Sequence, residues 1–114
     1  MPYLLHDPKV KKTRRLRKIV DETTQVRCAL GKGLIREEVW QDSRGTVAKY
    51  NLAFINHVLC TRNNGRVVGY DNNHGDHHRH FAGAEENFAF ISYERLLKQF
   101  LDEVRELRQK KEPI

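Results

Sequence analysis

Histidines crowd into one short stretch of this sequence. Four of the six in the chain lie within seven residues, beside two aspartates and an arginine: His74, His77, His78 and His80, with Asp71, Asp76 and Arg79. Histidine gains and loses protons near neutral pH, and its neutral imidazole binds transition metals. The stretch therefore predicts either an acid–base site that needs no cofactor or a site for a divalent metal ion.

A strand through this stretch would sort its side chains onto two faces, because alternate residues of a strand point in opposite directions. Phe81 is the natural residue to face a core. That choice places Asp76, His78 and His80 together on the other face, as three metal ligands or as acid–base groups. Asp71 with His74 is a second possible ligand pair.

Arg79 falls on the Phe81 side of such a strand, near the margin of the core. A guanidinium there needs a carboxylate partner, such as Glu85 or Glu86. A bulge beside the site would instead gather Arg79 with the histidines. In a third interpretation the histidine run neither catalyses a reaction nor binds a metal. Its polar side chains would then protect an edge strand from edge-to-edge aggregation.

Positive charge is concentrated at the N-terminus. The chain carries a formal +6, and removing the seven basic residues between residues 9 and 18 leaves about −1 for the rest. We expect an arm over residues 1–18 and a single domain over residues 19–114. The arm is either a solvated tail or a phosphate-binding segment, since neutralising phosphates releases counterions. Its expected nucleic-acid contacts are Lys11, Lys12, Arg14, Arg15, Arg17 and Lys18.

Strand patterns fill the first two thirds of the chain. The clearest has Ala48, Tyr50, Leu52 and Phe54 on one face, the period of two typical of a half-buried strand. Asn63-Asn64-Gly65 suits a tight hairpin turn, here between strands at 59–62 and 66–71. Further strands are expected at 20–30, 34–40 and 77–82.

A helix is expected from about Ser92 to about Lys110. Serine is a good N-cap, and Glu94 lies where the helix dipole favours an acid. Apolar residues recur at helical spacing and mark one face: Tyr93, Leu96, Leu97, Phe100, Leu101, Val104 and Leu107. We expect this face to pack on the sheet through Leu97, Phe100, Leu101 and Val104. The predicted fold class is α+β: an antiparallel β-sheet of about five to six strands with a C-terminal helix packed on one face.

No apolar run is long enough to span a bilayer, and the N-terminus lacks the pattern of a signal peptide. Two cysteines form neither a CxxC pair nor a disulfide framework. We therefore expect a cytoplasmic protein with reduced thiols and no membrane partner.

The order of these motifs resembles a known family. The run GRVVGYDNNHGDHHRH, a short acidic loop and the segment FAFISYERLLKQFLDEVREL are similar to TumE-type toxins of prokaryotic toxin–antitoxin systems. The likeness covers about Trp40 to Leu107. It implies a toxin neutralised by a helix-turn-helix antitoxin. The matching positions are Tyr50, Tyr70, Asp71, Asn72, His74, Gly75, Asp76, His78, Arg79 and His80.

Three functions fit these residues. In a metal-independent ribonuclease, His78 and His80 are the acid–base pair, and Asp71 or Asp76 orients an imidazole. Arg79 and the arm then bind phosphate, and Tyr70 donates a hydrogen bond. In a metal-dependent nuclease or hydrolase, Asp76, His78 and His80 hold a divalent ion and its water. A non-catalytic protein would instead bind nucleic acid through the arm and a protein partner through the histidine face.

Overall fold

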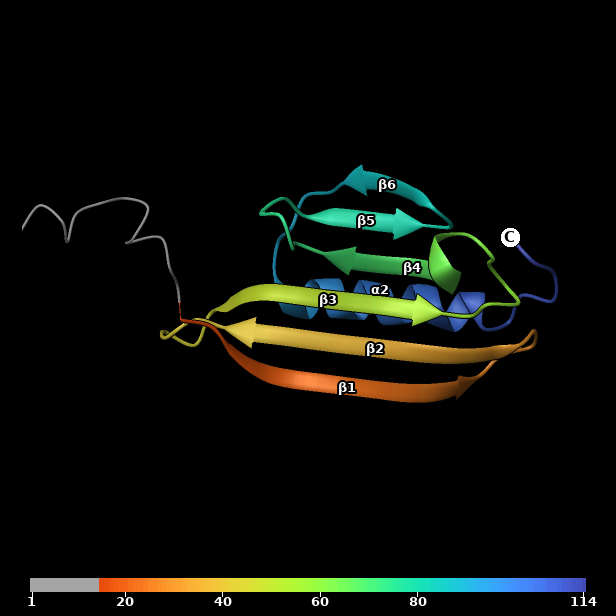
Figure 1. The fold of residues 1–114 in the computed structure, drawn as a ribbon, viewed down its shortest axis with the longest axis horizontal. Coiled ribbons are helices and arrows are strands. Elements are labelled where there is room, and N and C mark those ends of the chain that lie inside the picture. The colour runs from red at the N-terminus through yellow and green to blue at the C-terminus, as the bar shows by residue number, and fades with distance from the viewer. Residues whose placement is uncertain (1–14) are drawn as a thin grey trace, which may run out of the picture.

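Six strands form one antiparallel sheet in which each strand pairs with the next along the chain (Figure 1). The computed structural model describes residues 15–114. The strands are β1 (Arg17–Arg27), β2 (Lys32–Gln41), β3 (Val47–Ile55), β4 (Arg66–Asp71), β5 (His78–Phe81) and β6 (Ala84–Asn87). They are followed by the helix α2 (Tyr93–Leu107), and a short 3-10 turn, η2 (Asn63–Gly65), precedes β4. This arrangement confirms the predicted α+β class.

The core lies between β3, β4 and the helix α2. Tyr50, Leu52 and Phe54 alternate along β3 and are all buried on the helix side, as the sequence pattern predicted. Ser92 caps α2 by accepting a hydrogen bond from the backbone N–H of Arg95 at 3.2 Å. The first turn therefore has a fixed start, and the apolar stripe that follows is directed at the sheet.

The buried stripe of α2 is narrower than the expected one. Its buried residues are Leu96, Phe100, Val104 and Leu107. Leu97 packs at the edge of the core, whereas Leu101 is 40% exposed, so the expectation that Leu101 packs on the sheet was wrong. The helix packs mainly on β3 and β4, and a narrow contact of this kind buries a narrow stripe.

The connection between β3 and β4 differs from the predicted hairpin. Residues 59–62 form no strand, and β4 pairs with β3 instead. The side chain of Asn56 holds this loop: its Oδ1 accepts from the N–H groups of Val58 and Leu59 at 3.0 and 2.9 Å. Leu59 and Cys60 are thereby drawn into the core. The turn residues Asn63 and Asn64 do adopt positive φ angles.

β6 replaces the acidic loop expected after the histidine run. Ala82 and Gly83 both have positive φ, 47° and 92°, and Phe81 pairs directly with Ala84 across them. This backbone geometry is that of a two-residue hairpin turn. Alanine is uncommon at such a position, and the sequence AEEN has little strand propensity, so neither the turn nor the strand was expected.

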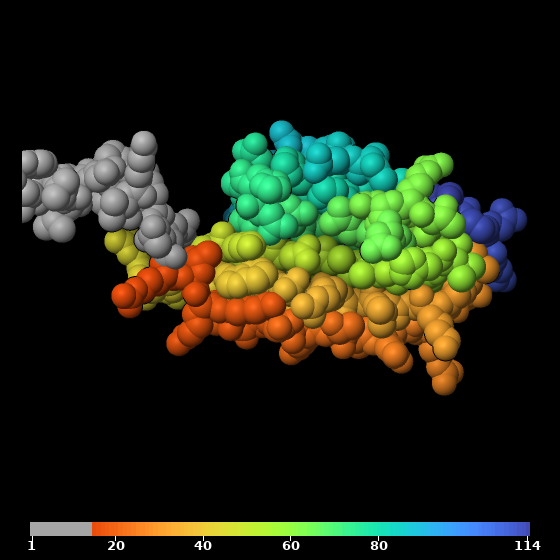
Figure 2. All heavy atoms as spheres, viewed as in Figure 1, coloured from red at the N-terminus to blue at the C-terminus, as the bar shows by residue number. Residues whose placement is uncertain are grey.

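Only one face of the sheet is covered by the helix. In Figure 1 α2 lies behind the strands, and Figure 2 shows the uncovered side of the sheet in front. We call this side the open face. Its side chains are mostly polar and occupy equivalent positions of neighbouring strands: Arg36, Glu38, Trp40, Lys49, Asn51, Asp71, His78 and His80.

β1 begins at Arg17, so the expected boundary after residue 18 falls inside a strand. Arg17 and Lys18, assigned to the basic arm, are therefore strand residues, and Arg15 lies just before them. The remaining expected contacts, Lys11, Lys12 and Arg14, lie outside the described residues. Within residues 15–114, no helix is long and apolar enough to cross a bilayer.

Candidate active site

Asp71 and His80 form a hydrogen-bonded pair on the open face. Asp71 is the last residue of β4 and pairs with His78, and His80 lies two residues further along β5, opposite Gly69. Nε2 of His80 donates to Oδ2 of Asp71 at 2.9 Å. The side chains are only 13% and 9% exposed. A carboxylate on one ring nitrogen fixes the tautomer and orientation of the imidazole, which leaves Nδ1 of His80 for a ligand.

Arg66 brings a positive charge to this pair. Its guanidinium lies 3.8 Å from Oδ2 of Asp71. The aliphatic part of Arg66 crosses the sheet above Gly69, where an added Cβ would come within 2.8 Å of Cδ of Arg66. Burial lowers the pKa of Arg66, while Asp71 and Glu85 act in the opposite direction. Arginine retains its charge at neutral pH under such conditions, so Arg66 is a fixed cation beside His80.

His78 completes the group. Its ring centroid lies 6.4 Å from that of His80, and its Nδ1 is 3.7 Å from Oε1 of Glu85. Nε2 of His80 is also 3.7 Å from this oxygen. We call Arg66, Asp71, His78, His80 and Glu85 the histidine cluster. An open pocket lies at its edge, lined by Arg62, Asn63, Arg66, His80, Ala82, Gly83, Ala84 and Glu85.

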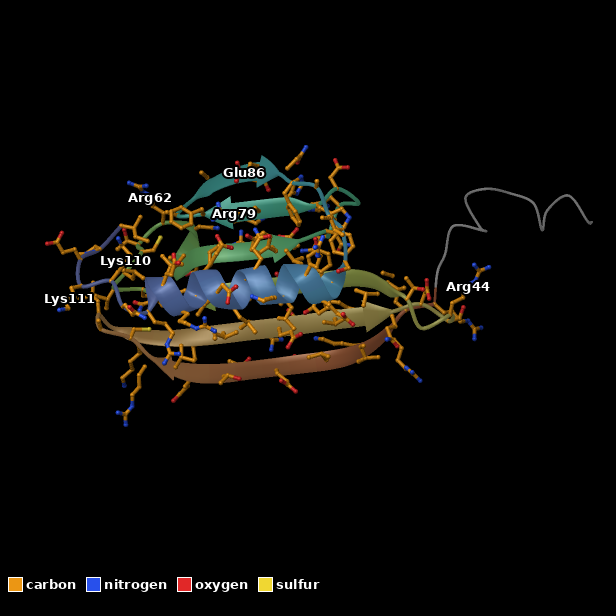
Figure 3. The ribbon with its side chains drawn as sticks, turned by 180° about the vertical axis from the view of Figure 1, so that it is seen from behind. Arg44, Arg62, Arg79, Glu86, Lys110 and Lys111 are labelled. Carbon is orange, nitrogen blue, oxygen red and sulfur yellow. The ribbon has the colours of Figure 1, made fainter. Side chains whose placement is uncertain are left out.

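Arg79 and Tyr70 lie on the opposite face, against α2. The Tyr70 hydroxyl donates to Glu103 and accepts from Nε of Arg79 at 3.1 Å and from Nε2 of Gln99 at 3.0 Å. Arg79 also forms ion pairs with Glu103 and, at 3.5 Å, with Glu86 (Figure 3). Glu86 is one of the two partners expected for Arg79. Glu103, on the helix, was not expected.

This second group forms a network that joins β4 and β5 to the helix. Burial, with a further contribution from Glu103, raises the pKa of Tyr70 to about 12, so its hydroxyl keeps its proton at neutral pH. The pairing of β4 with β5 runs without a bulge from Val68 to Asp71. Arg79 is therefore not gathered with His78 and His80, and both of its ion-pair partners are already carboxylates of this chain.

The other residues of the histidine run have different surroundings. Asp76 and His74 are exposed in the loop before β5, which begins only at His78. His77 turns to the helix side, where its ring stacks on Phe90 at 4.3 Å and its Nδ1 lies 2.7 Å from the Tyr50 hydroxyl. Burial lowers the pKa of His77. Within residues 15–114, no three His, Cys, Asp or Glu side chains are grouped to hold a metal ion, so the structure does not assemble Asp76 with His78 and His80.

Comparison with known families decides the relationship that the motifs suggested. The family model described as Toxin TumE matches residues 4–108, nearly the whole chain. The chain belongs to the TumE toxin family. The match is wider than the expected likeness from Trp40 to Leu107, because it includes most of the basic arm. No curated protein and no solved structure matches the chain.

Family membership indicates the toxin component of a toxin–antitoxin system, and hence an antitoxin as partner. In this TumE family protein the histidine cluster is the part of the open face best suited to chemistry. It combines an oriented imidazole, a second imidazole and a cation, which are the groups that acid–base reactions on a phosphate need.

Arg66 and Arg62 were not among the expected site residues of this TumE family protein. Both come from the loop and strand start that were expected to form a regular hairpin. In that hairpin their side chains had no predicted relation to the histidines. The available signal was Gly69, because a glycine within a strand often marks a close approach of another group.

Proposed function

We propose that this TumE family toxin is a ribonuclease whose active site is the histidine cluster. The observation that carries the proposal is the hydrogen bond between His80 and Asp71, which holds one imidazole with its second nitrogen available on an uncovered face. Arg66 and Arg62 at the neighbouring pocket supply positive charge for an RNA phosphate.

The reaction is cleavage of RNA by its own 2′-hydroxyl. One imidazole removes the proton from the 2′-hydroxyl, whose oxygen attacks the adjacent phosphorus. The bond to the 5′-oxygen breaks, and the other imidazole gives that oxygen a proton. A 2′,3′-cyclic phosphate and a 5′-hydroxyl result.

The spacing of the two rings supports this division of roles. Each catalytic nitrogen must come within about 3 Å of its oxygen. Rings whose centroids are 6.4 Å apart, as in His78 and His80, can reach opposite sides of one phosphate. Asp71 acts through His80 and is a positioning residue. Arg79 and Tyr70, which face the helix, have no part in these steps.

The proposal extends to the partners of the toxin. RNA is bound by the histidine cluster, by the basic arm and by the first residues of β1, and the basic contacts are Lys11, Lys12, Arg14, Arg15, Arg17 and Lys18. The cognate antitoxin is of the helix-turn-helix type, and the toxin acts in the cytoplasm, where its RNA substrates occur.

The test is cleavage of cellular RNA by pure protein in the presence of a chelator. His80→Ala and His78→Ala should each lower the rate by about 10²- to 10⁴-fold, the usual contribution of a general acid or base. Asp71→Asn should lower the rate and shift its pH profile, because an amide no longer fixes the imidazole tautomer. Products should end in 2′,3′-cyclic phosphate.

His74→Ala is the matched control, because His74 is exposed in a loop outside the cluster. It should leave both cleavage and growth arrest in cells lacking the antitoxin unchanged. Circular dichroism and melting temperature must show that every variant is folded. Activity that disappears in chelator and returns with a divalent ion would replace the proposal by a metal-dependent nuclease. RNA binding without cleavage would replace it by a binding protein.

A further inference from the structure

Trp40 stands on the open face between two lysines, away from the histidine cluster. Lys18 of β1 and Lys49 of β3 are its register neighbours on either side. Their ammonium groups lie over the indole ring, 4.9 and 4.6 Å from its centroid. Trp40 is the single tryptophan of the chain. A partly exposed indole flanked by cations has the composition of a nucleic-acid stacking site.

The two lysines differ in their other contacts. Nζ of Lys18 is held by Glu38 at 2.7 Å and by Asp21 at 3.0 Å. Lys49 forms no ion pair with any residue between 15 and 114, and its ammonium group lies over the ring of Trp40. Lys49 is therefore the cation that can leave the ring without breaking an ion pair.

We propose that Trp40 and Lys49 form a subsite for one nucleotide of single-stranded RNA. The base stacks on the indole face that Lys49 covers, and the Lys49 ammonium moves from the ring to the phosphate of that nucleotide. An exposed cation–π contact is weaker than the stack of a base on an aromatic ring, so the exchange is favourable. The inference depends on the proposed function for the choice of RNA as ligand.

The position of the subsite suits a strand that also reaches the histidine cluster. Lys49 is two residues before Asn51, and Asn51 pairs with Asp71, which pairs with His78. From the usual strand spacing and rise, Trp40 lies about 16 Å from His78 across the open face. An extended single strand covers this distance in a few nucleotides. The subsite would thus hold a nucleotide near the cleaved bond without touching it.

Other basic residues lie at the same end of the sheet. Arg15, Arg17 and Arg44 line one pocket, together with the single carboxylate of Asp42, beside the start of β1 and the turn between β2 and β3. Arg17 pairs with Gln41, the residue that follows Trp40. A nucleic-acid strand that leaves Trp40 at this end meets further positive charge, whereas Glu38 of β2 and Asp21 of β1 lie on the other side of Trp40, away from this end.

The emission of Trp40 gives a direct test, because no second tryptophan contributes to it. In a His80→Ala background that prevents cleavage, a short single-stranded RNA should quench the fluorescence. Inorganic polyphosphate, which has charge and no bases, should not. Trp40→Leu should weaken the binding of labelled RNA by about tenfold, within the range measured for one stacked base. It should leave polyphosphate binding unchanged.

Two further variants separate stacking from charge. Trp40→Phe keeps an aromatic face and should restore most of the affinity that Trp40→Leu loses. Lys49→Gln should reduce the salt slope of RNA binding by about 0.7, the value for one phosphate of a single strand. Lys111→Gln, which removes one charge from the exposed C-terminal segment (Figure 3), should leave the slope unchanged.

Equal RNA affinity of folded Trp40→Leu, or equal quenching by polyphosphate, would overturn the subsite. An equal response to duplex RNA would overturn its assignment to single strands. These results are independent of cleavage. If RNA quenches the fluorescence but the protein never cleaves RNA, the subsite is supported and the ribonuclease proposal is contradicted. If the protein cleaves RNA but RNA does not quench the fluorescence, the ribonuclease proposal is supported and the subsite is contradicted.

Discussion

Tyr70 and Asp71 are consecutive residues of β4 with opposite surroundings. The Asp71 side chain faces the open side and holds His80, and the Tyr70 side chain faces α2 and holds Arg79 and Glu103. One strand thus supplies both the positioning group of the proposed active site and the polar contact that joins sheet to helix. Substitutions at the two positions should have separable effects.

Tyr70→Phe tests the helix side. It removes a buried hydroxyl bonded to two charged groups, so we expect the free energy of unfolding to fall by about 1.5–3 kcal/mol. The rate of RNA cleavage, measured well below the melting temperature, should be retained. Denaturant unfolding and a cleavage assay check the two halves of this expectation. A stable Tyr70→Phe variant with no activity would return Tyr70 to the chemistry.

His77 should make the stability of the protein depend on pH. Burial lowers the pKa of His77 in the folded state below its ordinary value of 6.5. As the pH falls through that value, the unfolded chain takes up the proton first, so the free energy of unfolding should decrease. Well above the ordinary value, the imidazole of His77 is neutral in both the folded and the unfolded state. His77 then makes no contribution to the pH dependence of stability.

The measurement is the free energy of unfolding between about pH 7.5 and pH 5, near the ordinary histidine value. His77→Phe keeps a ring for Phe90 to stack on. Whatever its effect on absolute stability, it should reduce the decrease in the free energy of unfolding that occurs on acidification. His74→Gln, in the exposed loop, should leave the slope as in the parent protein. Parallel curves for His77→Phe and the parent would show that His77 is not the group responsible.

At the scale of elements, α2 depends on the stripe that it buries. Phe100 is fully buried against Tyr70, and Leu101 beside it is 40% exposed. Phe100→Ala should cost about 3–5 kcal/mol of stability, as for other buried aromatic truncations. Leu101→Ala should change stability by less than about 1 kcal/mol. Chemical denaturation of the two variants checks the contrast, and similar losses would mean that the helix is rotated from this position.

The strongest periodic patterns predicted their elements. β3 and α2 were expected because their apolar spacing is long and regular, and Ser92 was expected as the N-cap. The conformation of the loop after β3 was not predicted. Asn56 organises this loop through contacts with Leu30 and Leu59, and a local sequence pattern does not reveal such contacts. β6 was missed since its Ala82-Gly83 turn and acidic sequence give weak signals.

Part of the histidine cluster was predicted, because residue alternation along a strand is also a regular local pattern. Alternation on a strand places His78 and His80 together, and Asp71 was expected to orient an imidazole, as its contact with His80 now allows. The separation of Arg79 from them follows from the same alternation. Glu103 and Arg66 could not be found this way, because one comes from the helix and the other from an irregular strand start.

At the scale of the whole molecule, the basic arm should provide affinity for RNA and little stability. Replacing Lys9, Lys11, Lys12 and Arg14 by Gln removes four charges and leaves β1 intact. If all four reach phosphates of a single strand, the salt slope of RNA binding should fall by about 3. Binding measured across a salt series, with the melting temperature as control, checks this. An unchanged slope would assign the arm's charge to solubility.

The strand order has a consequence for how the protein is made. Every strand pairs with its neighbour in sequence, so each hairpin can form as soon as its second strand has left the ribosome, and such local contacts favour rapid folding. The apolar side of β3 and β4 must nevertheless wait for Tyr93–Leu107. We expect the nascent chain to pass through an intermediate in which the apolar face of the sheet is exposed. Aggregation of this intermediate competes with the docking of the last helix.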